Sequence, residues 1–157
     1  YSAGGDVLIS GKASVTSDWQ SGISVNNDVT IKSGTGQIFL DGDATATTGD
    51  FAWNAGINMN AGNGDTVRFY SASNVHPAIS LNGKGGLDSG IQYTYGDGRN
   101  DILLQALGSG GLKLTGTTNS TIGPSASVWK LVRATVTVMS AFLRNGKSAI
   151  AMSTRAR

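Results

Sequence analysis

The feature that most constrains this chain is a short motif of two apolar residues on either side of one other residue, with Gly, Asn or Asp nearby. Alternation with a period of two is the pattern of a β-strand that buries one face, and Gly, Asn and Asp favour tight turns. The motif therefore predicts many short strands joined by turns. The apolar pairs are Val7/Ile9, Ile23/Val25, Val29/Ile31, Ile38/Leu40, Ile57/Met59, Val67/Phe69, Ile79/Leu81, Ile91/Tyr93, Ile102/Leu104 and Leu112/Leu114.

The spacing of these pairs predicts how the strands are organised. From Ile57 onward the pairs follow one another at steps of 10, 12, 12, 11 and 10 residues. Such regularity indicates stacked rungs, and two strand-and-turn units would make a coil of roughly 20 residues. We expect six residues to point inward in stacked columns, namely Ile38, Leu40, Ile102, Leu104, Leu112 and Leu114.

A longer self-similarity supports a repeated architecture. Residues 21–23 (SGI) recur at 89–91 (SGI), and residues 27–29 (NDV) recur at 100–102 (NDI). Solenoids tolerate small insertions in their turns because each coil contacts only its neighbours. The alternative is that sequence rich in Gly, Ser and Thr aligns with itself trivially. We favour an all-β fold, a parallel β-helix or solenoid over residues 1–123.

The composition agrees with strands rather than helices. The chain has 23 glycines, and all ten of its acidic residues are Asp, so the good helix former Glu is missing. There is no Cys, which removes disulfides and thiolate metal sites. The chain begins at Tyr1 without an initiator Met or the regions of a signal peptide, and we expect a processed product or a fragment of a longer protein.

Charge divides the chain and marks a distinct basic C-terminal segment over residues 124–157. Residues 1–101 contain all ten Asp and five basic residues, whereas residues 102–157 contain seven basic residues and no acid. Within this tail, the apolar residues fall at helical spacing, but the β-branched run at 134–138 and the Asn145-Gly146 pair favour a β-hairpin. The segment is apolar enough to act as a cap on the last coil. Its dispersed basic residues indicate a solvated face; the alternative is a patch for an anionic glycan, lipid or nucleic acid.

Motifs that would support catalysis or metal binding are weak. His76 is the only histidine and precedes Pro77, so we expect a turn residue. Asp41 and Asp43 are two positions apart and could point to one side of a strand as paired glycosidase carboxylates, although Asp-Gly-Asp is ordinary turn chemistry. Residues 96–103 (GDGRNDIL) resemble a single calcium-binding turn, and residues 108–111 (GSGG) open a strand rather than a phosphate-binding helix. We expect no catalytic residue, no cofactor and no metal site.

Three segments resemble the repeat units of filamentous-haemagglutinin-like exoproteins, which include the stalks of contact-dependent inhibition proteins. They are residues 4–11 (GGDVLISG), 27–42 (NDVTIKSGTGQIFLDG) and 108–116 (GSGGLKLTG). The resemblance implies a right-handed parallel β-helix that is exported through an outer-membrane secretion partner. It implies a non-catalytic adhesin or stalk, secreted or at the bacterial cell surface, with a rod-like surface that meets a glycan or protein receptor; no specific nucleic acid partner is expected.

The competing interpretation is a phage tail fibre or tailspike that binds or cleaves surface polysaccharide. It would use Asp41, Asp43, Asp97 or Asp101 as acid and base, in a cleft with aromatic residues that stack on sugars. Trp and Tyr residues are scattered along the chain, so the sequence does not assemble such a cleft.

Overall fold

The computed structural model describes residues 1–14, 20–46, 54–61, 65–86, 89–95, 101–118, 130–131, 137–143 and 147–153; for 93–95, 101, 130–131, 137–143 and 147–153 it describes the backbone alone. These residues form thirteen strands and no helix. The strands are β1 (Val7–Lys12), β2 (Ile23–Asn26), β3 (Val29–Ser33), β4 (Ile38–Asp43), β5 (Ile57–Ala61), β6 (Thr66–Ser71), β7 (Ile79–Gly85), β8 (Ile91–Tyr95), β9 (Asp101–Ala106), β10 (Leu112–Thr118), β11 (Lys130–Leu131), β12 (Thr137–Leu143) and β13 (Lys147–Ser153).

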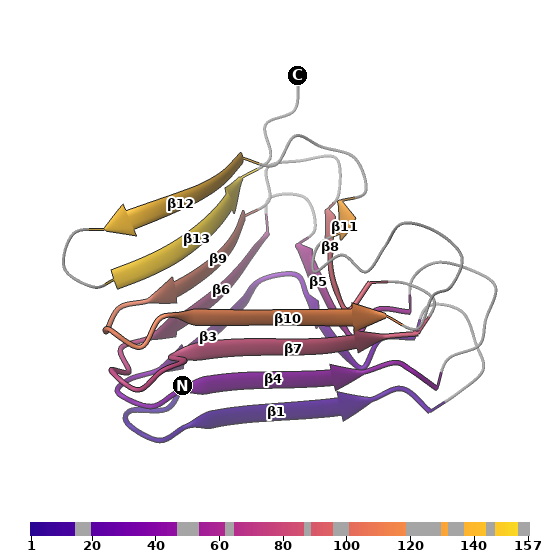
Figure 1. Ribbon diagram of the computed structural model, residues 1–157, viewed down its shortest axis with the longest axis horizontal. Coiled ribbons are helices and arrows are strands. Elements are labelled where there is room, and N and C mark those ends of the chain that lie inside the picture. The colour runs from indigo at the N-terminus through magenta and orange to yellow at the C-terminus, as the bar shows by residue number, and fades with distance from the viewer. Residues whose placement is uncertain are drawn as a thin grey trace.

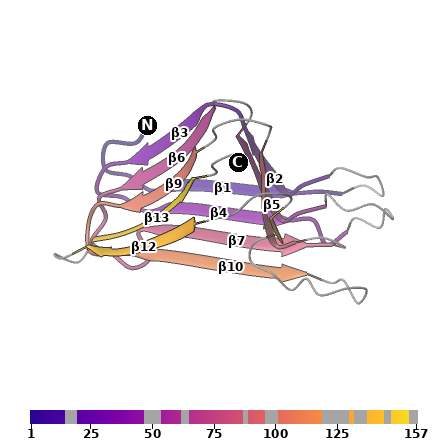
Figure 2. The same ribbon diagram turned by 90° about the horizontal axis from the view of Figure 1, so that it is seen from above.

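The strands build three sheets that share one stacking direction (Figure 1). The first sheet has the order β1-β4-β7-β10, the second β11-β8-β5-β2, and the third β12-β13-β9-β6-β3. From β1 to β10, every pairing between neighbours is parallel. Seen from above, the three sheets enclose a common interior (Figure 2). The fold is thus an all-β, solenoid-like stack, as the sequence predicted.

The expected coil of roughly 20 residues is wrong, because each coil contains three strands rather than two. The coils β1–β2–β3, β4–β5–β6 and β7–β8–β9 each give one strand to each sheet. Successive coils take 31, 41 and 33 residues, counted from Val7 to Ile38, Ile79 and Leu112 in the first sheet. Each step of ten to twelve residues separates one strand from the next along the chain. A coil has three strands because three sheets enclose the core.

All ten apolar pairs lie on the first ten strands, one pair on each strand. The self-similar segments also lie in matching places: residues 21–23 and 89–91 lead into β2 and β8, and residues 27–29 and 100–102 lead into β3 and β9. Each match joins two strands of one sheet that are two coils apart. The similarity therefore reflects stacking rather than a trivial alignment.

The core consists of aliphatic columns that run through the coils. Of the residues predicted to point inward, Ile38, Leu40, Ile102 and Leu104 are at most 1% exposed. Leu112 and Leu114 pack against the same cluster but are only partly buried. They lie on β10, which has a neighbouring strand on one side only. The inward register is confirmed, and incomplete burial follows from the position of β10 at the edge of its sheet.

Two columns of glycine line one corner of the stack. Gly11, Gly42, Gly83 and Gly116 are paired neighbours across the first sheet. A second column (Gly22, Gly56, Gly90) directly precedes β2, β5 and β8. The backbone of one column lies against the backbone of the other, so the first and second sheets meet here at a separation that leaves no space for a β-carbon.

The C-terminal segment extends two of the sheets. β11 pairs in parallel with β8, while β12 and β13 are antiparallel neighbours and β13 also pairs antiparallel with β9. In the third sheet the parallel pattern therefore ends at β9. The Asn145-Gly146 pair, for which the sequence predicted a hairpin turn, and the boundary near Gly123 and Pro124 lie outside the described residues. Over the described ranges, no helix is long and apolar enough to cross a membrane.

Candidate functional site

A groove lies on the outer face of the third sheet. Alternate residues of β3, β6 and β9 point inward to the core, as Ile31, Phe69 and Leu104 do, so the residues between them point outward. The outward residues fall in register, and the groove runs across the three strands in the stacking direction. It is lined by Thr30, Lys32, Arg68, Tyr70, Gln105 and Leu107.

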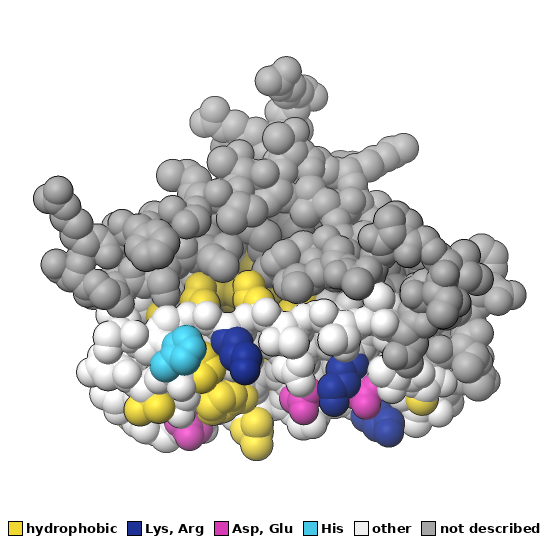
Figure 3. Space-filling view, viewed as in Figure 1, with side chains coloured by type: hydrophobic (Ala, Val, Ile, Leu, Met, Phe, Trp, Pro, Cys, Tyr) yellow, Lys and Arg dark blue, Asp and Glu magenta, His cyan; other side chains and the backbone are white. Residues whose placement is uncertain are grey.

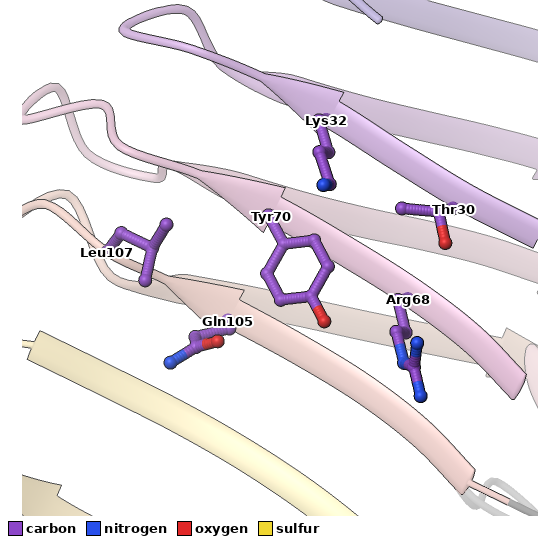
Figure 4. Close-up of a pocket in the computed structure, with 6 residues that line it drawn as sticks. All are labelled: Thr30, Lys32, Arg68, Tyr70, Gln105 and Leu107. Atoms are coloured by element: carbon purple, nitrogen blue, oxygen red, sulfur yellow. The ribbon is translucent and has the colours of Figure 1, made fainter.

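The groove is centred on Tyr70. Figure 4 shows the Tyr70 ring between Lys32 and Arg68 toward one side and Gln105 and Leu107 toward the other. The Nζ atom of Lys32 lies 5.6 Å from the centre of the ring, within the range of a cation–π interaction. The groove has a volume of about 310 Å³, which is the size of a small-ligand site.

The electrostatic character of the groove is basic. Two of its six lining residues are cationic and none is acidic. Asp28, in the turn before β3, is not among the lining residues. Its carboxylate accepts hydrogen bonds from the backbone N–H and the hydroxyl of Thr66, at 2.8 and 3.2 Å. A guanidinium, an ammonium and a half-buried aromatic ring can together bind an anionic group that is attached to a flat apolar body. The six residues offer no carboxyl or imidazole group for general acid–base chemistry.

The structure places Asp41 and Asp43 on the outer face of the first sheet, away from this groove. The expectation of a turn at Asp-Gly-Asp is wrong, because both carboxylates lie within β4, where their spacing of two places them on its outward side. Across the sheet, Asp43 has Lys12 and Lys84 as its paired neighbours. Figure 3 shows basic and acidic side chains next to one another on this face.

The two carboxylates are held by different partners. Asp43 accepts hydrogen bonds from the hydroxyl and the backbone N–H of Thr45, at 2.6 and 2.9 Å. These bonds, with smaller contributions from Lys12 and Lys84, lower the pKa of Asp43 below its ordinary value, although desolvation opposes the shift. Asp41 accepts a hydrogen bond from the amide of Asn82 at 2.8 Å. A lowered pKa suits an ionised structural carboxylate, whereas a general acid requires a raised pKa.

The remaining sequence candidates lie in turns or outside the described residues. His76 is in the turn between β6 and β7, where its Nδ1 donates a hydrogen bond to the carbonyl oxygen of Gly110 at 2.6 Å. Residues 108–111 form the turn that opens β10, and Gly111 adopts a φ of 70°, which favours glycine. Asp97 lies outside the described residues, and only the backbone of Asp101 is described. Within the described ranges, no group of three His, Cys, Asp or Glu residues could hold a metal ion.

Sequence reasoning did not find the groove. Its residues are 38 and 35 positions apart, from Lys32 to Tyr70 and from Tyr70 to Gln105, and they become neighbours only through the pairing of β3 with β6 and of β6 with β9. A signal was present in the strands themselves, because the outward positions of β3 and β6 carry cationic and aromatic residues. That signal could be used only after the coils had been aligned.

Comparison with known proteins gives no match, whether to a protein family, to a curated protein or to a solved structure.

Proposed function

We propose that this chain is a segment of an exported bacterial surface protein that acts as an adhesin or stalk. In this proposal the stack is a right-handed parallel β-helix whose outer face meets a glycan or protein receptor on a host or neighbouring cell. The observation that carries it is the in-register continuation of all three sheets from coil to coil. A stack of this kind grows in one direction without a change of local structure, as a stalk requires.

The length of the present stack sets what such a segment can do. Adjacent strands are about 4.8 Å apart. The four strands of the first sheet (β1, β4, β7 and β10) therefore span only about 15 Å along the stacking direction. A rod-like shape would come from many such coils in series. The contribution of this segment is therefore best measured by where it is displayed and what it contacts, rather than by its own elongation.

Support for export comes from the sequence. The repeat-like segments at 4–11, 27–42 and 108–116 resemble those of exoproteins that leave the cell through an outer-membrane partner. They coincide with β1, with β3 and β4, and with the turn into β10. The proposed location is the bacterial surface or the medium, and the proposed partners are the secretion pore and a cell-surface receptor.

Surface display and cell contact test this function together. Intact producing cells would be treated with protease and probed with an antibody raised against residues 1–157. We expect the antigen to be lost from intact cells and the purified chain to bind to cell surfaces. Antigen that is protected until the cells are lysed would overturn the proposal.

A tail fibre or tailspike would give a different result in solution. It would form a trimer and, if catalytic, would shorten polysaccharide chains. Light scattering of the purified chain and the viscosity of capsular polysaccharides after incubation distinguish the two functions. A monomer that leaves the polysaccharides unchanged is the outcome expected for an adhesin or stalk segment.

A further inference from the structure

We propose that the groove on the outer face of the third sheet binds an acidic sugar residue, with the sugar carboxylate at Lys32 and Arg68 and the sugar ring on Tyr70. This inference rests on the proposed adhesin function and names the ligand class that the segment contacts. It is carried by the arrangement of one aromatic and two cationic side chains in a groove whose six described lining residues include no acid.

The two cations are placed to share one carboxylate. Lys32 is the paired neighbour of Tyr70, and Arg68 is two positions before Tyr70 on the same outward face of β6. The Cα atoms of Lys32 and Arg68 are therefore diagonal neighbours in the sheet, roughly 8 Å apart. Both side chains are long enough to reach one anionic group between them. The planar guanidinium of Arg68 matches a carboxylate in a bidentate arrangement, and Lys32 supplies a second charge.

Tyr70 supplies the surface for the rest of the sugar. Its ring lies at the centre of the lining residues (Figure 4), and it is only half-buried. An exposed aromatic face packs well against the C–H groups of a pyranose ring, and the phenol hydroxyl can bond to a sugar hydroxyl. The Nζ atom of Lys32 lies 5.6 Å from the centre of the ring, so the cation and the aromatic surface are next to one another.

The other lining residues fit the neutral part of a sugar. Thr30 and Gln105 offer hydroxyl and amide groups for sugar hydroxyls, and Leu107, which is 40% exposed, offers an apolar contact. A groove of about 310 Å³ accommodates one or two sugar residues. Two cations suit a single acid group; a nucleic acid or a heavily sulfated chain would be held by a longer series of cations.

The test uses pairs of ligands that differ only in the acid group. Oligosaccharides of galacturonate, glucuronate and sialic acid would each be titrated into the full chain, beside the carboxyl-reduced form of the same oligosaccharide. Calorimetry would measure the affinity. We expect at least one acidic oligosaccharide to bind, and its carboxyl-reduced form to bind about tenfold more weakly or worse, because a charged hydrogen bond is lost.

Variants of the groove then locate the binding. Arg68→Gln and Tyr70→Ala should each weaken the binding of the acidic oligosaccharide about tenfold. The matched control is Lys113→Gln, which removes an exposed positive charge from β10 on a different sheet. Circular dichroism would show that all three variants keep the β signal of the parent, since all three side chains point outward.

Three results would overturn the inference. The first is equal binding of the acidic and carboxyl-reduced forms, and the second is an equal loss of binding in Lys113→Gln and Arg68→Gln. The third is that none of the three acidic oligosaccharides binds. Surface display and cell contact are measured separately, so an adhesin that still binds cells after any of these results would have a different ligand, whereas loss of display would overturn the proposed function itself.

Discussion

Gly42 of β4 faces Gly56 so closely that a β-carbon on Gly42 would lie 2.1 Å from the carbonyl oxygen of Gly56. The coils on either side repeat this approach. A β-carbon on Gly11 would lie 2.1 Å from the carbonyl oxygen of Gly22, and one on Gly83 would lie 2.0 Å from that of Gly90. The obstructing atoms are backbone, and they cannot shift without disturbing the sheets they belong to. This contact closes each coil at the corner where the chain leaves the first sheet and later enters the second.

The first prediction concerns this glycine contact. Gly83→Ala should lower the free energy of unfolding by about 3 kcal/mol or more, because the new methyl group meets backbone that is fixed by strands on both sides. The control is Gly4→Ala, whose β-carbon would meet Thr35 Oγ1 at an ordinary 3.4 Å. Urea unfolding followed by circular dichroism measures both variants. Equal urea midpoints for Gly83→Ala and Gly4→Ala would show that the contact between the first and second sheets can widen to accept a side chain.

The second prediction concerns the aliphatic columns. Leu104 is 0% exposed, and Leu104→Asp places an unpaired carboxylate in the core at a cost of several kcal/mol. We expect this variant to be unfolded or aggregated. Leu8→Asp is the matched control, because Leu8 points outward from β1 and is 73% exposed, so it should remain folded. Soluble, fully folded Leu104→Asp protein would contradict the inward register of β9.

The third prediction is a pH dependence that comes from Asp43. Its pKa is lowered on folding from an ordinary value of 3.8, chiefly by the Thr45 hydroxyl and also by the Thr45 backbone N–H. The resulting stabilisation is therefore complete above the unfolded pKa and is lost as the pH falls through the folded pKa. The Tm difference between the parent and Asp43→Asn should be present at neutral pH and should shrink below about pH 4. A difference that stays constant down to about pH 3 would assign the effect to something other than ionisation.

Thr45→Val provides the companion test of the cause. The valine keeps the size of the side chain and the backbone N–H but removes the hydroxyl that bonds to Asp43. In the variant, the pKa of Asp43 should move up toward its ordinary value, so the loss of stability on acidification should be smaller and should be complete at a higher pH. Titration of the carboxylate by NMR would show this directly, and an unchanged titration would rule out the hydroxyl as the main cause.

The fourth prediction concerns the C-terminal segment. A chain that ends at Gly123 lacks β11 and β13, which pair with β8 and β9, so the edges of the second and third sheets would be uncovered. An uncovered strand edge beside apolar core promotes association, and we expect this shortened chain to aggregate. Size-exclusion chromatography and circular dichroism provide the measurement. A soluble monomer with an unchanged β signal would show that the segment is an appendage rather than a cap.

The sequence by itself determined the strands and the direction of their side chains. Alternation between apolar and polar residues is a local property, since successive side chains of any extended segment point to opposite faces. Val67 and Phe69 could therefore be assigned to the interior, and Arg68 and Tyr70 to the surface, without knowledge of their partners. The turn at His76 could also be predicted, because its neighbour Pro77 lacks the N–H that a ladder needs.

Only the tertiary structure decided which strands are neighbours, how many make a coil, and therefore where the groove lies. A strand carries no local signal for its partner in a parallel sheet, because the partner lies a whole coil further along the chain and the connection between them is long. That length varies from coil to coil, from 31 residues between Val7 and Ile38 to 41 between Ile38 and Ile79. The segments between strands differ in length from coil to coil, so the strands themselves stay in register and the inner columns stay aligned. Lys32, Tyr70 and Gln105 meet on the outer face because their inward neighbours Ile31, Phe69 and Leu104 pack in one column of the core.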